Sequence, residues 1–185
     1  MMRISLLITF TLMMLFFAAC DRPTKTPLTT VPAADLERYS GAWNELARYE
    51  NYTEAGCVGA TANYQRINDR LSVINSCYDG SGRLKAQDKG TMKVVEGSNN
   101  SKFKIDFPWR LQGDYWVLML AEDYRYSVVS TPDREYLWIL SRKTVLSPED
   151  RETILSTLTE LGFDTEKLYW TGFKAMCNVE SELKR

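Results

Sequence analysis

The chain has 185 residues, a length typical of one domain with a short appendage, and 44% of them are hydrophobic, which is enough for a core. Its 23 basic and 24 acidic residues give a net charge of −1, so a nucleic-acid partner is not expected. The chain has no histidine, which excludes imidazole bases and histidine metal ligands. Composition therefore favours a binding protein over an enzyme, and we expect neither a metal nor a cofactor.

The first 19 residues have the pattern of an export signal. Arg3 is the only charged side chain before Asp21, and an apolar run extends from Ile4 to Phe17, which is short for a membrane-spanning helix. The small pair Ala18-Ala19 before Cys20 resembles the lipobox of bacterial lipoproteins, although Phe17 stands where that box usually has leucine. The resemblance implies a signal peptide over residues 1–19 and a diacylglyceryl group on Cys20. The alternative is an ordinary signal peptide cut near Ala19.

The next segment, residues 20–34, contains prolines and threonines and no apolar period. Such a composition predicts a lipidated N-terminus followed by a flexible tether. We expect a barrel domain over residues 35–177 and a polar tail over residues 178–185.

The middle of the chain alternates strand and turn signals. Phe103, Ile105 and Phe107 alternate with polar residues, which is the period of a half-buried strand, and Asn68-Asp69 marks a hairpin. The eight expected strands are Ala42–Tyr49, Val58–Ile67, Leu71–Cys77, Leu84–Val95, Lys102–Phe107, Tyr115–Ala121, Tyr124–Ser130 and Glu135–Ser141, with a short final strand at Leu168–Thr171. Strands at this spacing predict an all-β, eight-stranded antiparallel barrel, a size that side chains can fill or that can hold one small ligand.

One helix is expected, over residues 148–161. Ser147 can cap it, Pro148 suits its first turn, and Gly162 stands where a helix often ends. Its single apolar stripe, Ile154, Leu155, Leu158 and Leu161, predicts that one face packs on the outside of the barrel.

Three short motifs resemble the conserved blocks of the lipocalin family. Gly41-x-Trp43 matches the first block and Asp123-Tyr124 the second, where Glu122 replaces the usual threonine, and Arg142 matches the arginine of the third. The resemblance covers roughly residues 35–175 and is closest to the bacterial outer-membrane lipocalins and apolipoprotein D. It implies an up-and-down barrel in which Arg142 stacks on Trp43, so Gly41, Trp43 and Arg142 are assigned structural roles.

The resemblance also implies a ligand cavity inside the barrel. Strand alternation, counted from Arg142, assigns an apolar and aromatic set to the interior. The predicted ligand-binding residues are Ala60, Ala62, Val73, Phe103, Ile105, Val117, Met119, Tyr126, Val128, Tyr136 and Trp138. Tyr64, Phe107 and Leu140 share the same parity. The alternative is a core packed without a cavity.

Walls of this kind suit an acyl chain, and similarity to the bacterial lipocalins points to fatty acids or lysophospholipids. The predicted function is therefore a membrane-anchored lipid carrier, not an enzyme. A catalytic alternative would use Glu45, which the pattern places near Trp43, as an acid in the same cavity. A third possibility is a filled barrel that acts only through protein interactions.

The cysteines other than Cys20 are Cys57, Cys77 and Cys177. Cys57–Cys77 would link the second and third strands, whereas similarity to apolipoprotein D implies Cys57–Cys177. We favour Cys57–Cys77 because bacterial relatives often carry both equivalents. Cys177 would then be free or would pair between molecules in a homodimer.

Two membranes are compatible with the anchor. The family places its nearest members in the outer membrane, facing the periplasm, which is our first expectation. Asp21, directly after the lipidated cysteine, favours inner-membrane retention as the alternative.

Overall fold

The computed structural model describes residues 26–108 and 110–172. All of the described strands belong to one nine-stranded sheet. The strands are β1 (Gly41–Tyr49), β2 (Gly59–Ile67), β3 (Arg70–Tyr78), β4 (Leu84–Val94), β5 (Lys102–Phe107), β6 (Arg110–Leu120), β7 (Tyr126–Ser130), β8 (Leu137–Ser141) and β9 (Leu168–Trp170). The helices are α1 (Leu36–Tyr39) and α2 (Pro148–Glu160), with single 3₁₀ turns η1 (Tyr52–Glu54) and η2 (Thr165–Lys167).

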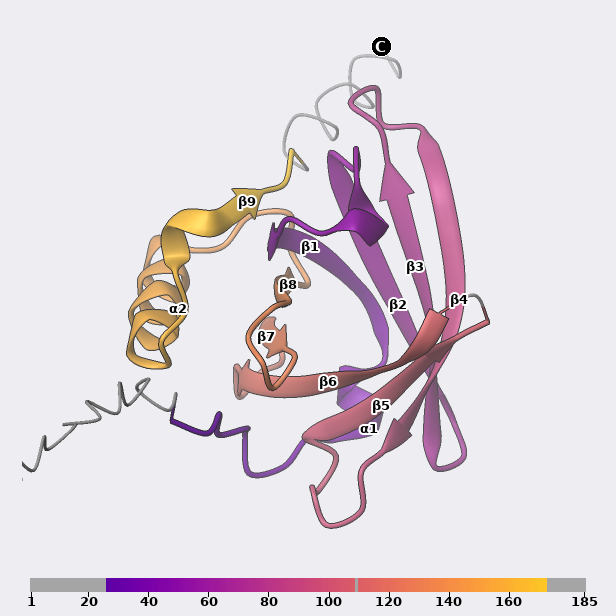
Figure 1. Cartoon of the computed structure of the whole chain (residues 1–185), viewed down its shortest axis with the longest axis vertical. Coiled ribbons are helices and arrows are strands. Elements are labelled where there is room, and N and C mark those ends of the chain that lie inside the picture. The colour runs from indigo at the N-terminus through magenta and orange to yellow at the C-terminus, as the bar shows by residue number, and fades with distance from the viewer. Residues whose placement is uncertain (1–25, 109, 173–185) are drawn as a thin grey trace, which may run out of the picture.

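The sheet closes on itself through β1. Each strand from β2 to β8 pairs antiparallel with the next, and β1 pairs with β2 over Gly41–Glu45 and with β8 over Asn44–Arg48. Figure 1 shows the resulting barrel, with α2 outside its wall. This confirms the predicted eight-stranded antiparallel up-and-down barrel with one helix packed outside. Antiparallel pairing of consecutive strands is expected here because short hairpin turns join neighbouring strands. At Ile67–Arg70, for example, Asn68 takes the left-handed conformation at φ 55°.

The short strand β9 extends the wall beyond the end of the β1–β2 pairing. It pairs with β1 over Ala47–Tyr49, where β2 has already diverged from β1. The chain just after β9 also bonds to the residue before β2, because the Gly172 amide donates to the Val58 carbonyl at 2.7 Å. The C-terminal segment thus supplies backbone partners on the open side of β1.

Helix α2 lies where the sequence predicts it. The Ser147 hydroxyl accepts from the Asp150 amide at 3.1 Å, so the expected N-cap is present. Ile154 and Leu158 are fully buried in a cluster between the helix and the outer face of the barrel. Arg125 also binds the helix, because its Nη2 lies 2.7 Å from Asp150 Oδ1.

The helix α1 has no counterpart in the sequence predictions. Four residues are too few to show a helical period, but Asp35 caps it by accepting from the amides of Glu37 and Arg38. Leu36 and Tyr39 are buried, so α1 covers one end of the barrel. This closed end is the floor of the interior.

The predicted flexible tether is corrected for residues 26–34, which pack against the barrel. Val31 donates to the Val117 carbonyl at 3.0 Å, the Thr30 hydroxyl lies 2.9 Å from that of Ser101, and Leu28 is buried in the cluster under α2. Prolines and threonines do not prevent an extended segment from adding to a surface when backbone partners are free. The signal segment, Cys20, Cys177 and the polar tail lie outside the described residues.

Within the part of the chain that the structure describes, no helix has both the length and the apolar character needed to cross a membrane.

Candidate functional site

The barrel encloses a cavity of about 140 Å³ between its floor and the end that carries η1. Residues from all eight barrel strands, β1 to β8, and from η1 contribute to its wall. It is lined by Glu45, Thr53, Glu54, Ala60, Thr61, Ala62, Tyr64, Asn75, Ser76, Cys77, Ala86, Asp88, Ile105, Phe107, Gly113, Asp114, Tyr115, Val129, Thr131, Trp138 and Leu140. The lining is apolar near the floor and polar near η1. A ligand with an apolar part and a polar part therefore fits this distribution.

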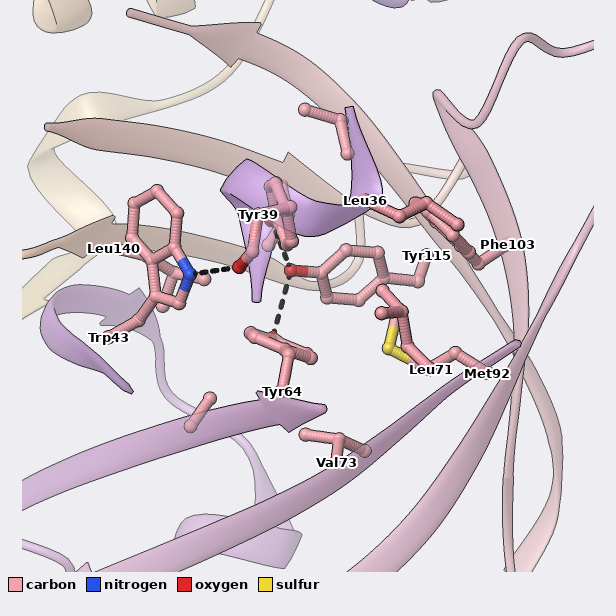
Figure 2. Close-up of a cluster of buried hydrophobic side chains, with 13 residues drawn as sticks. Leu36, Tyr39, Trp43, Tyr64, Leu71, Val73, Met92, Phe103, Tyr115 and Leu140 are labelled. Atoms are coloured by element: carbon pink, nitrogen blue, oxygen red, sulfur yellow. Dashed lines mark hydrogen bonds between the residues drawn. The ribbon is translucent and has the colours of Figure 1, made fainter. Parts of the chain in front are cut away.

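The floor is a layer of aromatic and aliphatic side chains packed around Leu36 and Tyr39 of α1 (Figure 2). Three tyrosines meet within it: the Tyr115 hydroxyl lies 2.8 Å from that of Tyr39 and 3.0 Å from that of Tyr64. Burial raises the pKa of Tyr39 to about 12 and raises those of Tyr64 and Tyr115 well above 10. The floor therefore presents neutral hydroxyls, not phenolates, to the cavity.

Arg142 joins the end of the last barrel strand to the first. Its guanidinium carbon lies 3.8 Å from the centre of the Trp43 ring, within cation–π range. The guanidinium also donates to the carbonyls of Arg38, Tyr39, Ser40 and Ala42. Gly41 adopts φ 94°, and a Cβ there would lie 3.4 Å from Arg142 Nη1. Gly41, Trp43 and Arg142 therefore form a structural contact beneath the cavity and do not line it.

The predicted ligand-binding residues fall into three groups in the structure, with Tyr136 apart from all three. Ala60, Ala62, Ile105 and Trp138 line the cavity. Val73, Phe103 and Val117 point into the barrel but belong to the packed floor. Met119, Tyr126 and Val128 lie in the cluster between the outer wall and α2, and Tyr136 stacks on Trp138 without reaching the cavity.

The outward position of Met119, Tyr126 and Val128 corrects the parity prediction. An irregularity between Val117 and Met119 in the β6–β7 pairing moves Met119 to the outer face. On β7, Val129 is the direct partner of Trp138, and cross-strand partners share a face. Val129 therefore faces inward and Val128 outward.

A polar group on the cavity wall was missed by the apolar criterion. Asn75 and Cys77 share the parity of Val73, so the same alternation could have found them. Glu54 comes from a 3₁₀ turn, which has no alternation to follow. Glu45 does lie inside, as the sequence suggested, and is 4% exposed.

The carboxylate of Glu45 is held by Arg48, whose Nη1 lies 2.8 Å from Oε1. Burial raises the pKa of Glu45 well above 4.5, and the neighbouring Glu54 carboxylate raises it further. Glu54 Oε2 in turn accepts from Trp138 Nε1 at 3.0 Å. Two neighbouring carboxyl groups, those of Glu45 and Glu54, therefore border the cavity.

Cys57 and Cys77 form a disulfide with a Cα–Cα distance of 5.3 Å. Of the two predicted pairings, the structure thus has the one between the second and third strands. The bond fixes the end of the η1 loop to the cavity wall, because Cys77 lines the cavity. The described residues contain no group of three or more side chains suited to hold a metal ion.

A closed eight-stranded barrel with one internal cavity defines a class of small-ligand binding proteins. A family model described as Lipocalin-like domain matches residues 34–172. The chain belongs to this lipocalin family.

Similar proteins include outer membrane lipoproteins. The chain is 36% identical over 154 residues to "Outer membrane lipoprotein Blc" of Escherichia coli (strain K12), covering 82% of this chain and 87% of the relative. It is 34% identical over 148 residues to the protein of that name in Vibrio cholerae serotype O1, covering 78% and 86%. Mouse (Mus musculus) apolipoprotein D is 30% identical over 148 residues, covering 74% and 76%.

Solved structures agree on the fold. Insecticyanin from the tobacco hornworm Manduca sexta superimposes with a TM-score of 0.65 at 22% identity, covering 80% of this chain and 85% of that one. Family membership implies binding of small hydrophobic ligands.

Proposed function

We propose that this protein is a lipid-anchored carrier that binds fatty acids or lysophospholipids at the periplasmic face of the outer membrane. The observation that carries the proposal is the cavity, which has an apolar floor and a polar opposite end. Its relatives include outer membrane lipoproteins, and Ala18-Ala19-Cys20 resembles the anchor sequence of a bacterial lipoprotein.

The cavity volume limits how much of the ligand is enclosed. About 140 Å³ is below the roughly 300–1,000 Å³ of typical small-molecule sites and resembles a cavity that accommodates benzene. Each buried CH₂ contributes about 0.8 kcal/mol, so even a partly inserted chain gains several kcal/mol before ordering costs. The barrel as it stands therefore encloses part of an acyl chain, and the remainder extends towards the polar end.

Ala62→Trp is expected to weaken binding of a lysophospholipid with a twelve-carbon chain at least tenfold. Ala62 is 7% exposed and lines the cavity, so a larger side chain would occupy the space of the ligand. Calorimetry measures the affinity, and a ligand that binds only the folded state should also raise the melting temperature of the wild type. Asn63→Trp, on the exposed face of the same strand, is the matched control and should bind normally.

The same variant separates a cavity from a packed core. In a packed core the larger side chain would cost about 1–3 kcal/mol of stability, and the wild type would show no binding to lose. That pair of results would reject the carrier function.

Cys20→Ser is expected to release the protein from the membrane or leave it unprocessed. Two or three acyl chains hold a protein firmly, so lipidation should dominate localisation. Membrane fractionation by density separates the outer from the inner membrane in the wild type. A processed Cys20→Ser protein that stayed with the membrane would contradict the anchor.

A catalytic alternative is favoured only by the raised pKa of Glu45. Its Oε1 is engaged by Arg48, which suits a structural or binding role as well as an acid. Turnover of a lysophospholipid that is abolished by Glu45→Gln would support the enzyme.

A further inference from the structure

The cavity is unevenly charged. Four of the described residues that line it are carboxylates, Glu45, Glu54, Asp88 and Asp114, and none of the described lining residues is lysine or arginine. Asp114 has its own partner, since its Oδ1 lies 2.7 Å from Lys104 Nζ. The polar wall thus offers acceptors to a ligand and little positive charge.

Glu45 and Glu54 share a single cation. Arg48 Nη1 bonds to Glu45 at 2.8 Å, and Arg48 Nε lies 3.9 Å from Glu54 Oε2. The guanidinium is held behind the wall, because Nη2 donates to the Cys57 carbonyl at 2.9 Å and its carbon lies 4.6 Å from the centre of the Tyr169 ring. It therefore neutralises one carboxylate without entering the cavity.

The remaining negative charge needs a positive partner. The Glu45 side chain is 5% exposed and that of Glu54 is 19% exposed, so solvent compensates little of the charge of this pair. A proton or a bound cation completes its charge balance.

We propose that the cavity selects single-chain amphiphiles with an ammonium head group, bound against Glu45 and Glu54, over free carboxylates. The inference rests on the proposed function and specifies its ligand class. An ammonium group carries up to three N–H donors, which match the acceptors of this wall, and its alkyl chain would lie against the apolar floor. A carboxylate head would add a like charge beside the pair, which is unfavourable in a poorly solvated site.

Proton linkage follows from the same geometry. Burial and the Glu54 carboxylate raise the pKa of Glu45, so a proton competes with the ammonium head for the Glu45 carboxylate. The ammonium group and the proton compete for the same carboxylates. Ammonium affinity should therefore rise with pH through the titration of Glu45, whereas carboxylate affinity should fall. The titratable and charged groups facing Glu45 are Arg48 from β1, Glu54 from η1 and Tyr64 from β2.

The experiment compares octylammonium, octanol and octanoate, which share one chain and differ in head charge. Calorimetry on the purified protein should give at least tenfold tighter binding of octylammonium than of octanoate, with octanol between them. Repeating the titration in two buffers of different ionisation enthalpy should show up to one proton released per ammonium bound.

Glu54→Gln is the principal variant, because Glu54 lies on a surface turn and glutamine keeps its shape. It should reduce the preference for ammonium at least fivefold and remove the proton release. Glu45→Gln should do the same, and Glu54→Gln decides the test if that buried variant fails to fold. Asp106→Asn, which removes an exposed carboxylate on the outer face of β5, should keep the wild-type preference.

Equal binding of octanoate and octylammonium, or an unchanged preference in folded Glu54→Gln, would overturn the inference while the carrier function stands. Failure of all three probes, octanol included, would overturn the carrier function itself.

Discussion

Trp43→Ala is expected to destabilise the protein by about 3–5 kcal/mol, because it removes a fully buried ring from the floor of the barrel. The ring packs against Tyr39 at a centroid distance of 5.2 Å, and its Nε1 donates to the Tyr39 carbonyl at 2.8 Å. The lost packing would also free the closing helix α1. Urea denaturation of the wild type and the variant measures the difference.

Arg142→Ala should also destabilise, and its effect should not add to that of Trp43→Ala. The two side chains share one contact, and Arg142 binds the α1 carbonyls that Trp43 also supports. Pairs in contact show coupling of about 0.5–3 kcal/mol in double-mutant cycles. Trp116→Ala, in the cluster under α2, is the control and should add to Arg142→Ala within about 0.5 kcal/mol. Simple additivity for the Trp43 pair would contradict the stacked arrangement.

Removing the disulfide with Cys57→Ser and Cys77→Ser together is expected to cost about 3 kcal/mol. The bond closes a loop with a sequence separation of 20 residues, and such a constraint chiefly raises the free energy of the unfolded chain. For a protein of this size that loss should lower the melting temperature by about 6–12 °C.

Cys177→Ser supplies the matched control for the disulfide. It leaves Cys57 and Cys77 intact, so the melting temperature should stay at the wild-type value under non-reducing conditions. A loss in Cys177→Ser as large as that in the double variant would show that Cys57 pairs with Cys177 instead, because the double variant removes Cys57 as well. Peptide mapping of the intact protein identifies the pair directly.

Local sequence patterns determined most of the barrel. Alternation such as Phe103, Ile105 and Phe107 depends only on the two-residue period of a strand, and the Ser147 cap depends only on neighbours within one helical turn. The family motifs also identified the first and last strands of the barrel, because Gly41-x-Trp43 marks the first strand and Arg142 follows the last. These features could be predicted because each depends on residues that are close together in the sequence.

The face that each side chain presents was decided by the tertiary structure. One irregularity after Val117 reverses the faces of the residues that follow, so Met119 lies under α2 instead of in the cavity. The sequence does not reveal this irregularity, because Val117, Leu118 and Met119 are all apolar and both faces of β6 are therefore apolar there. The packing of residues 26–34 likewise depends on carbonyls that only the folded barrel presents.

The candidate ligand site also required the closed barrel. Glu45, Glu54 and Trp138 come from β1, a 3₁₀ turn and β8, and they meet because β1 pairs with β8 and the η1 loop lies against both. The sequence by itself determined the class of fold, the position of the helix and an inward Glu45. Only the tertiary structure decided which carboxylates share Arg48, since that sharing depends on distances between segments that the chain separates.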